Sequence, residues 1–308
     1  MTAPHPTAMV LGNCTGASIA AALPKSGFFA KVDSAVVFSL PTEKRALQAQ
    51  ELGAYDFILT IEHGDQFGPL ATATLKETYS GKVFTLPTPF FSGLMPDMVY
   101  LRRNNQITRA EGVLGDYHSG LILQECKDGL SQADVVNRYE SGAAFDRLDI
   151  RGVWNDSLNE LKSREAHTDI ALSDHIESRI DSGMIVNDFL TMNHPTEGLI
   201  NHIAQKFVLA VIGTQARITP LEASEHPLNA GIRWPLHPAV ASTMGLHAKP
   251  DTTYRIRKGL EYMEFSAAEF ARRSYAYFCI SNLPTEFAVA SPPAHRNTYQ
   301  TEGLGCAE

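Results

Sequence analysis

The chain has 308 residues, of which 44% are hydrophobic and 19% charged, so it is long enough to bury a sizeable core and has an ordinary soluble composition. Its formal net charge is −8 and no run of lysine and arginine occurs, which argues against a nucleic-acid partner. No apolar run approaches the roughly 18 residues of a membrane span, and the first residues lack a secretory-signal pattern, so we expect a cytoplasmic protein.

The first ninety residues alternate between apolar segments and segments rich in helix formers. Strands are expected at residues 8–13, 34–40, 54–61 and 82–87, and helices at residues 17–26, 42–53 and 69–80. This alternation is typical of a parallel sheet with right-handed crossovers, and continuous apolar runs indicate strands that are covered on both faces. We therefore predict an α/β fold with a parallel, doubly wound N-terminal sheet.

From about Tyr117 the sequence favours helices. They are expected at residues 131–142, 155–180 (as one or two helices), 195–213 and 266–282, and the tail from Pro284 has the composition of a loose arm. No repeat or linker divides the sequence. We therefore expect a single domain over residues 1–308, with an α/β subdomain at 1–115 and a mostly helical part at 116–308 that completes a ligand pocket.

Cys14 stands in a turn of small residues, MVLGNCTGAS, between the first expected strand and the first expected helix. Open α/β sheets bind ligands at this edge, and a helix N-terminus lowers the pKa of a thiol. Cys14 is therefore a candidate nucleophile and Gly12 a candidate ligand contact. A candidate oxyanion hole consists of the Asn13 side chain and the backbone amides of Thr15 and Gly16. The alternative is that the cysteine only fills space, because a free cysteine packs like a modest hydrophobe.

The chain has four cysteines, Cys14, Cys126, Cys279 and Cys306, without the paired spacing of metal ligands. No zinc motif occurs, so the sequence implies no metal. In a reducing compartment all four should be free thiols. We expect Cys126 and Cys279 to be unreactive, because they lie in apolar helical stretches. A tyrosine-phosphatase loop is excluded, since Ala20 stands where that chemistry needs an arginine.

His194 lies in the segment MNHPTEGLINHIAQ, directly before Pro195 and the helix that this proline is expected to open. It is a candidate general base for Cys14, although the sequence does not show whether the two side chains meet. The alternative is that Asn193 and His194 only cap the helix, with Glu197 completing the cap, although histidine is a poor cap. Asn193 is also a candidate positioning residue.

Other candidates for ligand binding are a histidine after the third strand, two residues of a polar turn, and three arginines that suit phosphate: His63, Tyr117, His118, Arg102, Arg103 and Arg151. His63 should share the sheet edge of Cys14, or else lie in a solvated loop. Ser119 would cap the helix after the polar turn. His202 is expected on the solvated side of its helix.

Four sequence blocks, taken in order, resemble the signature of the WcbI-type family of capsular polysaccharide biosynthesis proteins. They are GNC at 12–14, FFSGLMPDMVYL at 90–101, YHSG at 117–120 and MNHPTEGLINHIAQ at 192–205. The family is regarded as coenzyme A-dependent acetyltransferases. The resemblance implies a cradle-like α/β fold around a deep pocket for acetyl-CoA, with Cys14 and His194 at the reaction centre. Neither a P-loop nor a G-x-G-x-x-G motif occurs, so coenzyme A follows from the resemblance alone.

The layout is also distantly similar to SGNH hydrolases, which carry GDS after the first strand and D-x-x-H-P before the last helix. Cys14 replaces the serine, and Thr191 stands where an aspartate is expected, three residues before His194. The residue that orients His194 is therefore open between Asp188, Asn193 and a backbone carbonyl.

From the resemblance we expect transfer of an acetyl group from acetyl-CoA to a sugar hydroxyl of a surface polysaccharide or its precursor, with other polysaccharide biosynthesis proteins as further partners. Two routes are open. Cys14 carries the acetyl group as a thioester, or His194 activates the sugar for direct attack. The alternatives are an acyl esterase that uses the same two residues and a non-catalytic coenzyme A-binding protein.

Overall fold

A computed structural model describes residues 5–103, 109–185, 188–214, 218–246, 252–281 and 287–290. The chain forms two compact units whose segments alternate along the sequence. Unit 1 comprises Met1–Phe90, Leu161–Phe189 and Asn193–Ala230, and unit 2 comprises Phe91–Glu160, Leu190–Met192 and Gly231–Glu308. The division therefore falls after Phe90 rather than at residue 115, and the second half of the chain contributes to both units.

Within the described residues, unit 1 is built on a four-stranded sheet in which all neighbouring strands are parallel. Its strands are β1 (Thr7–Gly12), β2 (Lys31–Val36), β3 (Phe57–Ile61) and β4 (Val83–Leu86), in the order β2-β1-β3-β4. The predicted α/β fold with a parallel N-terminal sheet is confirmed. Because β2 and β3 lie on opposite sides of β1, the strand order reverses at β1. Open sheets bind ligands at the carboxyl ends of the strands around such a point.

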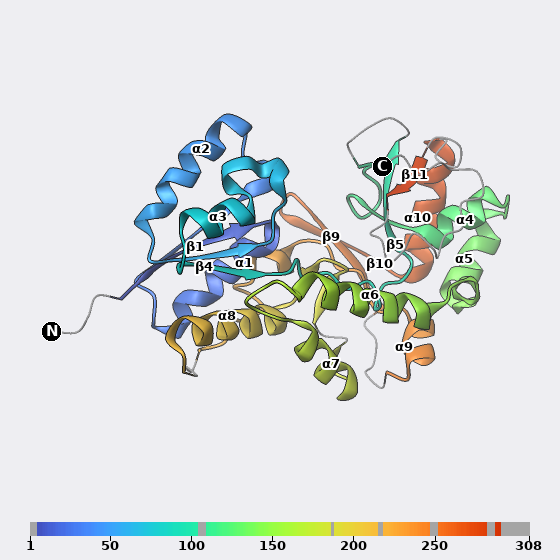
Figure 1. Ribbon diagram of the computed structural model, residues 1–308. Helices are drawn as coiled ribbons and strands as arrows, with labels where there is room; N and C mark the ends of the chain where they lie inside the picture. Colours follow the sequence, from blue (N-terminus) through green and yellow to red (C-terminus); the bar gives the residue numbers. More distant parts are fainter. Residues whose placement is uncertain are drawn as a thin grey trace. The chain divides into compact units, whose positions relative to one another are not determined.

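Helices cover both faces of this sheet, with α2 and α3 on one side and α8 on the other (Figure 1). The helices of unit 1 are α1 (Cys14–Ala22), α2 (Thr42–Glu51), α3 (Thr72–Thr78), α7 (Ser173–Asp181) and α8 (Glu197–Ile212). Short 3-10 helices accompany them at η1 (Leu23–Ser26), η2 (Val37–Ser39), η3 (Leu52–Ala54), η4 (Asp65–Leu70) and η7 (Pro227–Ala230).

Each face of the sheet has its own apolar core. Met9 and Leu11 of β1 share a buried cluster with Leu75 of α3. On the face of α8, Phe207 contacts Phe84 of β4 at a ring distance of 5.5 Å. Burial on both faces accounts for strands that read as continuous apolar runs rather than as alternating patterns.

The second strand begins and ends earlier than the sequence predicts, at residues 31–36 instead of 34–40. Val36 pairs with Gly12, the last residue of β1, so from Val37 onward the chain has no neighbouring strand on that side. It turns into η2 instead, with Val37 buried and Phe38 exposed. These two residues keep the alternation of a strand after the strand itself has ended.

Unit 2 contains more strands than the sequence predicts. A three-stranded antiparallel sheet has the order β11-β5-β6, with β5 (Met98–Arg103), β6 (Tyr117–Ser119) and β11 (Phe287–Ala290). A hairpin pairs β9 (Tyr254–Lys258) with β10 (Glu261–Phe265). Part of the expected loose arm is therefore a strand, because residues 287–290 add to the edge of β5. Residues 116–308 nevertheless contain more helix than strand within the described part of the chain, as the sequence predicts.

The helices predicted in the second half are present. The helices of unit 2 are α4 (Gly120–Lys127), α5 (Gln132–Ser141), η5 (Ala143–Arg147), α9 (Pro238–Met244) and α10 (Ala267–Ile280), of which the sequence did not predict η5 and α9. The segment 155–180 is indeed two helices, α7 and α6 (Ile150–Glu165), the latter continuing from unit 2 into unit 1. Ser131 caps α5 by accepting a hydrogen bond from the Asp134 amide, as its spacing predicts.

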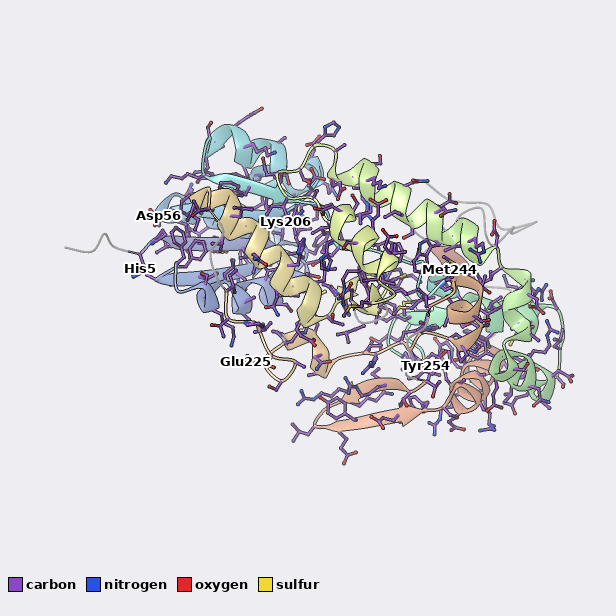
Figure 2. The ribbon with its side chains drawn as sticks, turned by 90° about the horizontal axis from the view of Figure 1, so that it is seen from below. His5, Asp56, Lys206, Glu225, Met244 and Tyr254 are labelled. Atoms are coloured by element: carbon purple, nitrogen blue, oxygen red, sulfur yellow. The ribbon has the colours of Figure 1, made fainter. Side chains whose placement is uncertain are left out.

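Asp97 is a buried carboxyl group in unit 2. Its Oδ2 accepts hydrogen bonds from the hydroxyls of Ser119 and Tyr139, both at 2.8 Å. The Tyr139 hydroxyl in turn lies 2.8 Å from that of Tyr254, which Figure 2 labels. Burial raises the pKa of Asp97 from 3.8 to about 6, and the hydrogen bonds from Ser119, Tyr139 and Trp234 offset only part of that rise.

Asp97 should therefore make the protein less stable as the pH rises. The folded carboxyl holds its proton more tightly than the unfolded one, so its contribution is complete below about pH 4 and is lost as the pH rises to about 6. The loss amounts to about 3 kcal/mol, from roughly two pKa units. Asp97→Asn removes this dependence. Denaturant unfolding at pH 4 to 7 should show a steeper fall for wild type than for the variant, and parallel curves would contradict the assignment.

Candidate active site

Asn13 fixes the start of α1 and with it the position of Cys14. Its side-chain oxygen accepts a hydrogen bond from the Thr15 amide at 2.9 Å, and its carbonyl accepts one from the Gly16 amide at 3.0 Å. Asparagine is among the best N-cap residues, so α1 begins at Cys14 rather than at residue 17. The thiol therefore lies in the first helical turn, at the positive end of the helix dipole.

The same hydrogen bonds bear on the predicted oxyanion hole. Thr15 and Gly16 both donate their amide hydrogens to Asn13, and the Asn13 side chain accepts one of them. These donors are the ones that an oxyanion hole would need. The cap occupies both backbone amides in this structure but uses only the oxygen of the Asn13 side chain and not its NH2 group, so a role of Asn13 in binding an oxyanion stays a prediction.

Gly12 ends β1 where that strand comes close to β3. A Cβ atom built at this position would lie 2.8 Å from Cδ1 of Ile61, a distance that side chains do not tolerate without a shift. The glycine therefore has a packing reason to be there. Its contact with a ligand stays a prediction.

His194 and Pro195 form the short strand β8 rather than the start of α8. The N-cap of α8 is Thr196, so the prediction that Pro195 opens the helix is wrong, as is the alternative that Asn193 or His194 caps it. The residue before a proline is pushed toward extended conformations, which suits a strand. The Thr196 amide donates to the Asp188 carbonyl at 2.8 Å and so closes the loop that carries His194.

The two candidate catalytic side chains meet. Cys14 Sγ lies 3.1 Å from His194 Nε2, although 180 positions separate the two residues in the sequence. Both are half-buried, and α1 packs against α8 within unit 1. At this distance the imidazole nitrogen can take the thiol proton and leave a thiolate. The contact that the sequence could not establish is confirmed, while the catalytic roles stay predictions.

A charged network lies beside the His194 loop. The buried carboxylate of Asp188 accepts a hydrogen bond from Arg179 Nε at 2.9 Å, and His175 Nε2 lies 3.8 Å from the same oxygen. Burial raises the pKa of Asp188, and Arg179 offsets part of that rise. Asp188 is one of the three candidate partners of His194. Its carboxylate pairs with Arg179, and its backbone carbonyl contacts the His194 loop by accepting a hydrogen bond from the Thr196 amide.

His202 is not the solvated residue that the sequence predicts. Its ring stacks on that of His175 at a centroid distance of 4.0 Å and is half-buried. Burial and the neighbouring His175 lower the pKa of His202 to about 4. The packing of α7 against this side of α8 covers a face that the sequence alone presents as polar.

His63 lies after β3, at the same sheet edge as Cys14, as predicted. The alternative of a solvated loop is wrong, because only 6% of the residue is exposed. Its Nδ1 lies 3.1 Å from the Thr60 hydroxyl, and its amide donates to the Thr72 hydroxyl at 2.8 Å. Burial lowers the pKa of His63 to about 4, so the ring is neutral at pH 7. A role in ligand binding stays a prediction.

The other candidate residues belong to unit 2. Tyr117 and His118 form a buried strand, β6, rather than a polar turn, while Ser119 caps α4 as expected. The Tyr117 hydroxyl accepts a hydrogen bond from Thr191, and His118 Nε2 lies 3.0 Å from the Ala110 carbonyl.

The three candidate arginines also lie in unit 2. Arg151 of α6 donates to the Thr243 carbonyl. Arg102 and Arg103 are in β5, and their side chains lie outside the described part of the chain. Binding of phosphate by these arginines stays a prediction.

The structure adds two general observations. Among the described residues, no group of three or more histidine, cysteine, aspartate or glutamate residues is placed to hold a metal ion. The described helices also include none that combines the length and the apolar character needed to cross a membrane.

These features define a doubly wound α/β protein with a thiol–imidazole pair at the carboxyl edge of its parallel sheet. The sequence pattern of the family described as polysaccharide biosynthesis enzyme WcbI matches residues 7–217. The chain belongs to this family, as the four sequence blocks predict.

One solved structure has the same fold, with a TM-score of 0.72, 17% sequence identity and 90% of each chain covered. That protein is described as WcbI, a novel polysaccharide biosynthesis enzyme, in a native form without a disulfide bond between coenzyme A and its own Cys14. A search among curated proteins found no match to the chain.

Cys14 should be the most reactive of the described thiols, because the helix N-terminus and the His194 imidazole favour its thiolate. Burial raises the pKa of Cys126 to about 12, which should make that thiol inert. Cys279 was expected to be shielded but is exposed, so it serves as the accessible reference. Cys306 lies outside the described residues.

Timed labelling with iodoacetamide at pH 7, read by peptide mass spectrometry, tests this order. We expect Cys14 to react first, Cys279 more slowly and Cys126 last. Faster labelling of Cys279 than of Cys14 would show that the site does not activate its thiol. The labelling rate of Cys14 in a His194→Leu variant separates the contribution of the imidazole from that of the helix.

Proposed function

We propose that the protein transfers an acetyl group from acetyl-CoA to a sugar hydroxyl during polysaccharide biosynthesis. The observation that carries the proposal is the 3.1 Å contact between Cys14 Sγ and His194 Nε2 at the carboxyl edge of the sheet. Membership of a polysaccharide biosynthesis enzyme family supports the sugar acceptor. The description of the structural neighbour, which names coenzyme A together with a cysteine, supports the donor.

The residues present suit the thiol end of coenzyme A. Cys14 is half-buried, stands at the first turn of a helix and has an imidazole beside its sulfur. A thioester exchange needs these features, namely a nucleophilic sulfur, a group that takes its proton and a positive field for the developing oxyanion.

In the first step, His194 takes the thiol proton and the Cys14 sulfur attacks the acetyl carbonyl carbon. The bond from that carbon to the sulfur of coenzyme A breaks, and the departing thiolate takes the proton back from His194. In the second step, His194 takes the proton of the sugar hydroxyl, whose oxygen attacks the acetyl-Cys14 thioester. The carbon–sulfur bond to Cys14 breaks, and the ester and the free thiol are formed.

A direct route uses the same residues differently. There His194 deprotonates the sugar hydroxyl for attack on acetyl-CoA itself, and Cys14 only shapes the site. Two further functions are possible for this site. Hydrolysis of an acyl ester would use Cys14 and His194 with water in place of the sugar, and a non-catalytic protein would bind coenzyme A without turnover. One set of incubations separates all of these.

Incubation of the purified protein with acetyl-CoA alone should acetylate Cys14, as intact-protein and peptide mass spectrometry would show. Adding a mixed sugar pool should then discharge the acetyl group onto sugar. Cys126→Ser is the matched control and should be acetylated at Cys14 as wild type is. Acetyl transfer to sugar by a Cys14→Ala protein would favour the direct route. Release of acetate without sugar product would favour the esterase. Binding of coenzyme A without any turnover would leave only the alternative of a non-catalytic coenzyme A-binding protein.

His194→Asn tests the proposed base. Asparagine cannot take a proton near neutral pH, so turnover should fall by about 10²–10⁴, the usual scale for losing a general base. Because Thr196 and not His194 caps α8, folding should be almost unaffected. The variant should melt within a few degrees of wild type and still bind coenzyme A in calorimetry. A folded variant that retains full activity would remove His194 from the mechanism.

A further inference from the structure

Three aromatic rings meet at the carboxyl edge of the parallel sheet. Phe38 follows β2 and His63 follows β3, and their ring centroids lie 5.6 Å apart. Phe67 of η4 completes the cluster, at 4.8 Å from Phe38 and 5.4 Å from His63. Because β1 lies between β2 and β3, the Phe38 and His63 rings meet across the end of β1, the strand that leads directly to Cys14.

Phe38 is unusual within this cluster because 58% of the residue is exposed, whereas Phe67 and His63 are each only 6% exposed. An exposed apolar ring that packs against two buried rings is held in place and can offer its face to a ligand. Such a face carries negative charge density and attracts the polarised C–H bonds of a pyranose. A site for a sugar acceptor must also lie close to Cys14, and this edge of the sheet satisfies that requirement.

The cluster holds a polar atom that has no use in the fold. Nε2 of His63 is buried and makes no hydrogen bond to any described residue. Native proteins rarely leave such an atom unpaired unless a ligand or water supplies the partner. The ring is neutral at pH 7, so this nitrogen can accept a hydrogen bond from a hydroxyl or, in the other tautomer, donate one.

Arg45 of α2 adds a positive group. Its guanidinium lies over the Phe67 ring at 5.0 Å, and it donates to the carbonyls of Leu40 at 3.2 Å and Gln66 at 3.1 Å. These contacts use Nε and Nη1, and Nη2 makes no hydrogen bond within the described part of the chain. The arginine is therefore held in place with a donor to spare, which suits a phosphate or a carboxylate.

We infer that Phe38, His63 and Arg45 form the acceptor subsite, and that the acceptor is a sugar carrying an anionic group, either a phosphate or a carboxylate. The pyranose face stacks on Phe38, a hydroxyl pairs with His63 Nε2, and the anionic group binds Arg45. This inference rests on the proposed function for the identity of the reaction. Its test needs no reaction, because it measures binding.

Titrations of the full-length protein by saturation-transfer NMR, without acetyl-CoA, test the subsite with glucose, glucose 1-phosphate and glucuronic acid. Wild type should bind an anionic sugar about tenfold more tightly than glucose, the scale of one charge-assisted hydrogen bond. Preference for the phosphate or for the carboxylate identifies the anionic group. Binding of none of the three, or equal binding of all, overturns the inference.

Three variants locate the site. Phe38→Ala should weaken binding about threefold to tenfold, as expected for one lost aromatic contact, and Phe38→Trp should restore it. Arg45→Met should remove the preference for anionic sugars and leave glucose binding unchanged. Tyr262→Ala is the matched control, because Tyr262 is also an exposed ring, 50% exposed, on β10 of unit 2.

Two measurements keep this inference separate from the proposed function. Acetylation of Cys14 by acetyl-CoA should proceed in Phe38→Ala as in wild type, because the acceptor takes no part in that step. If Phe38→Ala instead loses affinity for adenosine 3′,5′-bisphosphate, the rings bind the donor and the inference is wrong. Sugar binding without any acetylation of Cys14 would leave the subsite in place and remove the proposed function.

Discussion

The chemistry proposed for this protein depends on one contact, between the Cys14 sulfur and the His194 imidazole. The two residues lie 180 positions apart in the sequence. Three constraints bring them together. The parallel sheet ends β1 at its carboxyl edge, the Asn13 cap starts α1 at Cys14, and the packing of α1 against α8 brings the His194 loop to that point. A change in any of these displaces one partner without touching the other.

The His194 loop is held by polar contacts that contribute more to position than to stability. Asp188 is buried, and its charge is paired by Arg179, while its carbonyl closes the loop through the Thr196 amide. A buried ion pair adds little net stability, because desolvation offsets most of the attraction. Removing one partner is costly, however, since the other charge stays buried and unpaired. Such a pair is well suited to hold a loop in one arrangement, and the loop it holds here carries the candidate base.

The sequence predicts those features of the fold that arise from local patterns. Burial on both faces makes the strands of the sheet apolar throughout, and their alternation with helix formers indicates the parallel topology. The end of β2 was not predictable, because it depends on where β1 stops, at Gly12. The strand at residues 287–290 depends on pairing with β5, far away in the sequence. Nonlocal pairing of this kind leaves no signal within the segment itself.

The candidate site, too, has features that the sequence predicts and features that only the tertiary structure shows. Cys14 and His194 stand out because of their places at the ends of elements, but only the tertiary structure shows that they meet. The Asn13 cap was readable, since asparagine directly after a strand is a strong helix-start signal. The burial of His202 could not be predicted, because the polar side of α8 is covered by α7, whose His175 stacks on the His202 ring. Phe38 gave no signal either, because it continues an apolar alternation and only its exposure in the fold sets it apart.

The choice of sulfur at position 14 is itself informative under the proposed function. Coenzyme A delivers the acetyl group as a thioester, and exchange with a cysteine gives another thioester, so the first step is close to isoenergetic. Transfer from Cys14 to a sugar hydroxyl then gives an oxygen ester and runs downhill. A serine at the same place would release that free energy in the first step and leave the second nearly balanced. With cysteine, the driving force is kept until the acceptor is bound, so the enzyme must exclude water from the acetyl group in the meantime. The half-buried setting of Cys14 and the buried ring of His63 at the same edge of the sheet suit that need.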